Sequence, residues 1–135
     1  MSLADAEVQL LDYVQRFVPE KRKAPLAGNT IHTDRTFLAA HMPALEGHTH
    51  YRNVDVSTIK ELTRRWFPRV SFNTPVKSGN HRALADIQES IEELRYFREA
   101  VFVAAPGPDS TTLQTIARTH QGSLTGAFAP ADNVE

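Results

Sequence analysis

Two aspartates and one histidine have the residue types and the spacing of a metal-dependent phosphodiesterase site. His81 and Asp86 lie five residues apart where an apolar helical pattern begins, and Asp34 follows an apolar segment in similar company. Carboxylates bind divalent cations, and an imidazole can take a proton from an attacking water. The alternative is structural. Asp34 would then favour a helix N-terminus electrostatically, Asp86 would face solvent and His81 would cap a helix.

The geometry of a helix limits how His81 and Asp86 can meet. Five residues turn by about 500°, so two mid-helix side chains would diverge by about 140°. The two converge only if His81 lies at the helix start or just before it, and Ser78, Gly79 and Asn80 supply an irregular approach. Asp86 is then expected beside the apolar stripe of the helix, partly sheltered and with room for a cation.

The surrounding sequence predicts helices alternating with short strands. Periodic apolar residues predict helices at 2–18, 33–42, 57–66, 81–100 and 110–120. Short apolar segments bounded by turn residues predict strands at 24–27 and 51–56. We expect Pro43 to end the 33–42 helix, interpret 48–50 as a connection and 68–80 as a loop, and expect Ser57 or Thr58 to cap the 57–66 helix. The alternation indicates an α/β fold, for which two strands are few.

Composition narrows the function classes. The formal net charge of −1 over 135 residues lacks the basic surface typical of proteins that bind long nucleic acids, although a small nucleic-acid ligand held by metals needs none. The absence of cysteine excludes disulfides and thiolate metal sites. The N-terminus does not resemble a signal peptide, and no apolar run approaches the roughly 20 residues that span a bilayer. We therefore expect a soluble cytoplasmic protein with no membrane partner.

Three segments, in this order, resemble the oligoribonucleases, which are 3′→5′ exoribonucleases of the DEDDh group. The segments are LAGNTIHTDR at 26–35, HYRNVDVSTIKEL at 50–62 and HRALADI at 81–87. The resemblance runs from about residue 2 to 103, and the proline-rich 103–108 segment is similar to that of actinobacterial members. It implies an RNase H-like exonuclease fold that degrades short single-stranded RNA, dinucleotides above all, to nucleoside 5′-monophosphates.

The resemblance also assigns a metal site and a subunit contact. It implies that Asp34 and Asp86 help to hold two divalent cations, Mg²⁺ or Mn²⁺, and that His81 is the general base. Tyr51 matches a tyrosine that reaches into the partner subunit's site, so the resemblance implies a homodimer.

The resemblance assigns a phosphate site as well. Thr30, Arg52 and Ser57 match the positions that bind the 5′ phosphate of a dinucleotide. Thr30 stands where serine is usual.

One motif of these enzymes has no match. The Asp-x-Glu pair of an N-terminal strand supplies two further metal ligands. Asp5 and Glu7 have its spacing but lie in a predicted helix, where side chains two apart diverge by about 200°. We interpret the chain as N-terminally truncated, with a partial RNase H-like α/β fold that lacks the N-terminal strands, and expect impaired activity. The alternative is a catalytically inactive remnant that retains only a dimerisation surface.

The same resemblance suggests the domain organisation. Residues 1–103 would be the C-terminal portion of an exonuclease domain, and 104–135 a mostly disordered tail with one short helix. The remaining histidines have no ligand spacing on a clear element, and we interpret them as surface or packing residues rather than a second metal site: His32, His41, His48, His50 and His120.

Overall fold

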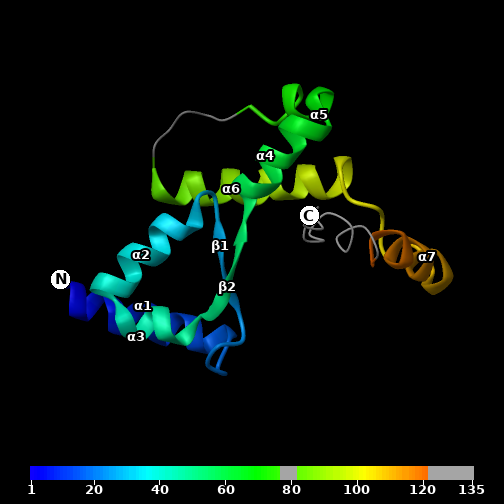
Figure 1. The fold of residues 1–135 in the computed structure, drawn as a ribbon. Helices are drawn as coiled ribbons and strands as arrows, with labels where there is room; N and C mark the ends of the chain where they lie inside the picture. Colours follow the sequence, from blue (N-terminus) through cyan, green and yellow to red (C-terminus); the bar gives the residue numbers. More distant parts are fainter. Residues whose placement is uncertain (77–81, 122–135) are drawn as a thin grey trace, which may run out of the picture. The chain divides into compact units, whose positions relative to one another are not determined.

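The computed structural model describes residues 1–76 and 82–121, and the chain divides into two compact units, Met1–Phe102 and Val103–Glu135. In the described part, the first unit holds two strands and six helices (Figure 1). They are α1 (Leu3–Phe17), β1 (Pro25–Gly28), α2 (Ile31–His41), α3 (Pro43–His48), β2 (His50–Asp55), α4 (Val56–Trp66), α5 (Pro68–Phe72) and α6 (Ala83–Ala100). The second unit holds α7 (Ser110–Gln121).

The two strands form a parallel pair, connected through α2 and α3 (Figure 1). Gly28 lies opposite Asp55 and Pro25 opposite His50, with a shift of register after Pro25. Parallel strands end at the same edge of a sheet. The segments that follow β1 and β2 therefore meet at one edge, where α2 and α4 begin.

Helix α1 shows why Asp5 and Glu7 do not form a chelating pair. Asp5 is bonded to Ser2 in a capping box at the helix start. Glu7 instead accepts hydrogen bonds from the backbone N–H groups of Ala44 and Leu45, at 2.6 and 3.1 Å, at the start of α3. Each carboxylate therefore accepts hydrogen bonds at the N-terminus of a different helix, Asp5 at α1 and Glu7 at α3. This agrees with the interpretation of the segment as a helix, on which the two side chains diverge.

The described core is small. Its buried apolar side chains are Ile31, Met42, Leu45, Val56 and Phe97. Three buried side chains are polar: His48, Thr63 and Glu93. His48 packs between α1 and α3, with Nε2 at 2.8 Å from the Val18 carbonyl oxygen, which agrees with a packing role for this histidine.

The predicted apolar stripe of α6 is largely exposed. Leu84, Ile87 and Ile91 are 67%, 57% and 46% exposed, whereas Phe97, near the other end of the helix, is fully buried. A two-stranded sheet offers too little surface to cover the whole helix. The fold is therefore α/β and partial, as expected from the sequence.

The predicted helices and strands are present, with boundaries shifted by a few residues, but three details were wrong. Two short helices were not predicted: α3 begins at Pro43, which was expected only to end a helix, and α5 lies in the segment interpreted as a loop. Pro43 and Pro68 begin these helices, because the first helical residue needs no N–H donor. Asp55, and not Ser57 or Thr58, caps α4: its Oδ1 accepts the Ser57 N–H at 2.9 Å.

The second unit contains the helix predicted near 110–120. Asp109 precedes α7 and its side chain accepts the Thr112 N–H at 2.7 Å. This hydrogen bond lowers the pKa of the Asp109 carboxyl below its ordinary value. No helix in the described ranges of either unit is long and apolar enough to cross a membrane.

Candidate active-site cleft

A cleft of about 780 Å³ lies between the end of β1, the start of α2 and the N-terminal half of α6. Gly28, Asn29 and Ile31 form one side of it, and Ala83, Ile87 and Ser90 contribute from α6. Its lining also includes Asp34 and Asp86, the two carboxylates that the sequence marked as metal ligands. The fold therefore brings to one cleft two acids that are far apart in the chain.

The two carboxylates have similar local settings. Asp34 lies in the first turn of α2 and Asp86 in the first turn of α6. The partial positive charge of a helix N-terminus stabilises a carboxylate there. Both residues are exposed. For Asp86 this corrects the expectation of a partly sheltered position, because the face of α6 that carries it has little cover.

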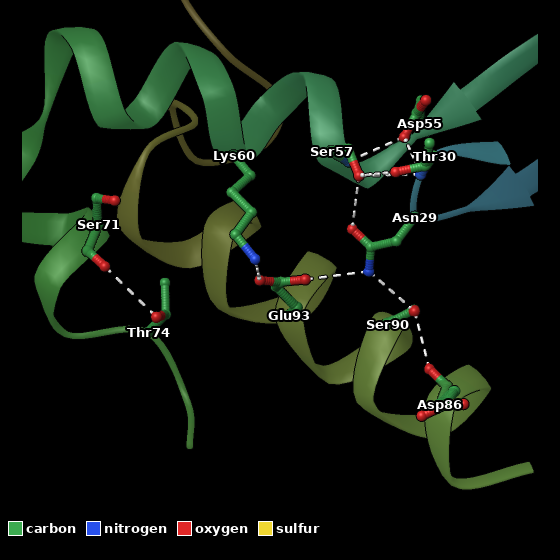
Figure 2. A network of polar contacts seen from close by, with 10 residues as sticks. All are labelled: Asn29, Thr30, Asp55, Ser57, Lys60, Ser71, Thr74, Asp86, Ser90 and Glu93. Carbon is green, nitrogen blue, oxygen red and sulfur yellow. Dashed lines mark hydrogen bonds and ion pairs between the residues drawn. The ribbon is translucent and has the colours of Figure 1, made fainter. Parts of the chain in front are cut away.

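The start of α2 packs closely against Gly28 at the end of β1. A side chain at Gly28 would place its Cβ at 2.9 Å from Cδ1 of Ile31, which is closer than real contacts allow. Thr30 follows in the left-handed region, with φ of 54°, a conformation that is strained for a β-branched residue. Its N–H donates to Asp55 Oδ1 at 3.0 Å and Ser57 Oγ at 2.9 Å, which hold it in place (Figure 2).

The predicted phosphate-binding residues fall into two places. The hydroxyl oxygens of Thr30 and Ser57 lie 3.1 Å apart at the strand ends. The guanidinium of Arg52 instead lies over the ring of Tyr51, 5.5 Å from its centroid, and that ring stacks on His50. Tyr51 and Arg52 are both exposed on β2. The predicted base, His81, lies outside the described residues.

Sequence reasoning missed Arg35, which orients the helix that carries Asp34. Its side chain is only 16% exposed, and Nη1 donates to Glu46 at 2.7 Å. Nε donates to the Asn53 side chain and Nη2 to the His50 carbonyl oxygen, each at 2.7 Å. One arginine therefore ties α2 to both α3 and β2. In the sequence, the one sign that Arg35 could matter for the site is its position directly after Asp34.

A polar network that includes Asn29 and Ser90 of the cleft lining was not predicted from the sequence (Figure 2). Glu93 is 4% exposed. It accepts hydrogen bonds from Lys60 Nζ at 2.9 Å and from Asn29 Nδ2 at 3.1 Å. In the sequence Glu92 and Glu93 look equivalent, and nothing in their pattern shows that only one is buried.

Asp34 and Asp86 are the residues that the sequence predicts as metal ligands. Among the described residues, no group of three or more histidine, aspartate or glutamate side chains is close enough to enclose a metal. Mg²⁺ commonly keeps several waters and binds through one or two carboxylates. Two carboxylates on one cleft could supply part of such an ion's coordination shell.

Comparison with known proteins decides the family. The family model for exonucleases of the RNase T type matches residues 1–94. The chain belongs to the RNase T exonuclease family. It is also 61% identical to the oligoribonuclease of Cutibacterium acnes over 94% of its own length and 63% of that relative. Its identity to the oligoribonuclease of Streptomyces avermitilis is 66% over 88% of this chain and 60% of that protein.

A mycobacterial relative extends the comparison. The oligoribonuclease of Mycobacterium avium is 53% identical over 87% of this chain and 54% of its own length. These matches confirm the predicted resemblance of this RNase T-type chain to oligoribonucleases. The chain spans about six tenths of the length of the curated relatives it matches.

Proposed function

We propose that these residues belong to a 3′→5′ exoribonuclease that degrades short oligoribonucleotides, dinucleotides above all, to nucleoside 5′-monophosphates. One observation carries the proposal: Asp34 and Asp86, which come from separate motifs, line the same cleft. Membership of the exonuclease family and the names of the relatives support it. Chemistry on a phosphodiester is the activity that such a pair of carboxylates serves best.

In this proposal Asp34 and Asp86 help to hold divalent metal, Mg²⁺ or Mn²⁺. When bound, the metal would supply positive charge to polarise the phosphodiester and to acidify the attacking water. The two carboxylates, at the starts of different helices, would hold the metal at a fixed place in the cleft. His81 would accept the proton of the water, because an imidazole titrates near neutral pH.

Thr30, Ser57 and Arg52 would bind the terminal 5′ phosphate. The adjacent Thr30 and Ser57 hydroxyls can donate to phosphate oxygens, and their fixed position lowers the cost of ordering them. Arg52 is exposed and its guanidinium can make two parallel hydrogen bonds to a phosphate. A site for a terminal phosphate would favour the shortest substrates, which have few other phosphates to engage.

A homodimer in the cytoplasm completes the proposal. Tyr51 is 65% exposed, so its ring is available to reach a partner subunit's site. One face of α1 carries the exposed apolar side chains of Leu3, Leu10 and Phe17, which recur every seven residues. Such a surface is typical of a subunit interface. An enzyme that acts on short RNA fragments would work where RNA is degraded, in the cytoplasm.

Residues 1–135 alone should hydrolyse dinucleotides slowly. Asp34 and Asp86 provide two carboxylates, which is few for two closely spaced cations. The second candidate is therefore a non-catalytic protein that presents an interaction surface, which the exposed stripe of α6 favours. A labelled diribonucleotide, incubated with Mg²⁺ or Mn²⁺, should be cleaved far faster by the Cutibacterium acnes relative than by residues 1–135. Comparable turnover that Asp86→Ala abolishes would show that the missing acids are within these residues.

A version extended to the length of the relatives separates the two candidates. His81→Ala should lower kcat by about 10²- to 10⁴-fold with little change in dinucleotide Kd, because a base acts in the transition state. Arg52→Ala should instead raise Kd, more for dinucleotides than for longer RNA, and Arg69→Ala, an exposed control, should change neither. No cleavage by the extended protein would favour the non-catalytic candidate. Loss of affinity without loss of rate in His81→Ala would refute the general-base role.

A further inference from the structure

We propose that Asn29 is a positioning residue that fixes the start of α6 to the strand ends, and so sets the position of Asp86 relative to Asp34. The side chain of Asn29 makes contacts on two helices. Its Oδ1 accepts from Ser57 Oγ of α4 at 3.1 Å. Its Nδ2 donates to Ser90 Oγ at 2.9 Å and to Glu93 Oε2 at 3.1 Å on α6 (Figure 2). One amide group thus joins β1, α4 and α6.

The two halves of α6 are held differently. The C-terminal half is anchored by Phe97, which is fully buried, and by the Tyr96 hydroxyl, which donates to the Val70 carbonyl oxygen at 2.8 Å. In the N-terminal half, Leu84 and Ile87 are mostly exposed. Polar contacts therefore have to hold the end of the helix that carries Asp86.

A chain of hydrogen bonds leads from Asn29 to the first turn of α6. Ser90 Oγ, which accepts from Asn29, donates to the carbonyl oxygen of Asp86 at 2.8 Å (Figure 2). The other acceptor, Glu93, is fixed by Lys60 Nζ at 2.9 Å. Asn29 therefore bonds to two successive turns of the helix, which restrains its direction as well as its distance from β1.

The contacts require an amide at position 29. The carboxylate of Glu93 can only accept, so its partner must donate. An aspartate in place of Asn29 would keep the contact with Ser57 but would set a second carboxylate against Glu93. Alanine would remove all three hydrogen bonds. The double variant Asn29→Asp/Glu93→Gln would reverse one bond, with the glutamine amide donating to the aspartate and its oxygen still accepting from Lys60.

Distances between spin labels test this role directly in the 135-residue chain. Because the chain has no cysteine, Ala40→Cys on α2 and Gln88→Cys on α6 can be labelled selectively. We expect a narrow distance distribution in the parent. Asn29→Ala and Asn29→Asp should broaden it, and the Asn29→Asp/Glu93→Gln pair should narrow it again. Asn73→Ala, a control that alters an exposed asparagine directly after α5, removes only a local hydrogen bond to the Arg69 carbonyl oxygen and should leave the distribution unchanged.

A second label pair separates positioning from general loosening. The distribution between Ala40→Cys and Thr58→Cys, on α2 and α4, should stay narrow in Asn29→Ala. Broadening of both pairs, or of neither in a folded Asn29→Ala protein, would overturn the proposal. If Asn29→Ala fails to fold, Ser90→Ala removes one contact and should broaden the α2–α6 distribution alone. An unchanged distribution in Ser90→Ala would also count against the proposal.

The consequence for metal binding rests on the proposed function, and Mn²⁺ serves as the probe. In the parent, Mn²⁺ should broaden the amide NMR signals of Asp34 and Asp86 at the same concentrations. Asn29→Ala should weaken this binding about 10-fold, the low end of the range for residues that support metal ligands. Unchanged Mn²⁺ affinity in Asn29→Ala would refute this consequence. No broadening in the parent would refute the proposed metal site, and the label distances would still decide the role of Asn29.

Discussion

Replacing Lys60 by methionine tests the polar network of Asn29, Lys60 and Glu93, because it removes the cation beside the buried Glu93 but keeps most of the aliphatic stem. The Lys60 side chain is 46% exposed, and that of Glu93 is 5% exposed. Their charged atoms lie 2.9 Å apart. After the change, Glu93 would keep its hydrogen bond from Asn29 but would face a site with no compensating positive charge from Lys60.

The expected loss of unfolding free energy follows from this difference in exposure between Lys60 and Glu93. Removing one partner of a fully buried ion pair costs about 3–5 kcal/mol, because the other charge stays buried. The lysine here is half-exposed, so water screens part of the effect, and we expect about 2–3 kcal/mol. For a unit of roughly 100 residues, that corresponds to a fall in Tm of about 10 °C.

Thermal unfolding followed by circular dichroism measures the change, and Lys23→Met is the matched control. Lys23 and Glu20 form a pair at 3.5 Å in which both side chains are about 70% exposed. Losing such a pair should cost about 0.5 kcal/mol or less. Lys60→Met/Glu93→Gln should recover much of the lost stability, since no buried charge remains. If Lys60→Met costs no more than Lys23→Met, the buried network does not stabilise the fold as argued.

Thr63→Val should raise the unfolding free energy by about 1 kcal/mol, because the buried Thr63 hydroxyl has no hydrogen-bond partner among the described residues. The same change at the exposed Thr58 of α4 should have almost no effect in the same thermal melts, and a destabilised Thr63→Val would contradict the argument. Ile87→Gln should reduce self-association without lowering Tm, since Ile87 is 57% exposed. Sedimentation velocity measures the association, and unchanged association would show that the α6 stripe is not the self-association surface. Ser2 hydrogen bonds lower the pKa of Asp5, so their stabilisation is present above the unfolded pKa and is lost as pH falls through the folded one. The Tm deficit of Ser2→Ala should therefore shrink between about pH 6 and about pH 2, and a constant deficit would refute this linkage.

Local signals in the sequence were sufficient for the elements and for the family. Apolar periodicity located the helices at 2–18 and 81–100, because one face of each carries the apolar side chains. Turn residues bounded the strand that ends at Gly28. The capping pair of Ser2 and Asp5 is likewise local, since both partners lie within one helical turn. The three motifs correctly predicted the exonuclease family.

Contacts between distant segments could not be predicted in the same way. Proline at residue 43 reads equally well as the end of one helix or the first residue of another. The periodicity of α6 placed Ile87 in its apolar stripe, but the exposure of that side chain depends on what lies opposite the helix. The sequence also gave no reason to choose between Glu92 and Glu93 as the buried acid.

The sequence by itself determined which side chains could carry the chemistry: Asp34, Asp86 and His81, with Thr30, Arg52 and Ser57 beside them. Their types and local spacing are properties of the chain. Only the tertiary structure placed Asp34 and Asp86 on one cleft and Thr30 against Ser57, while leaving Arg52 over Tyr51. For Thr30 and Ser57 the physical reason is that parallel strands end at one edge, so the pairing of β1 with β2 brings the starts of α2 and α4 together. Asp86 reaches the cleft because the packing of α6 and its hydrogen bonds to Asn29 hold that helix at the same edge.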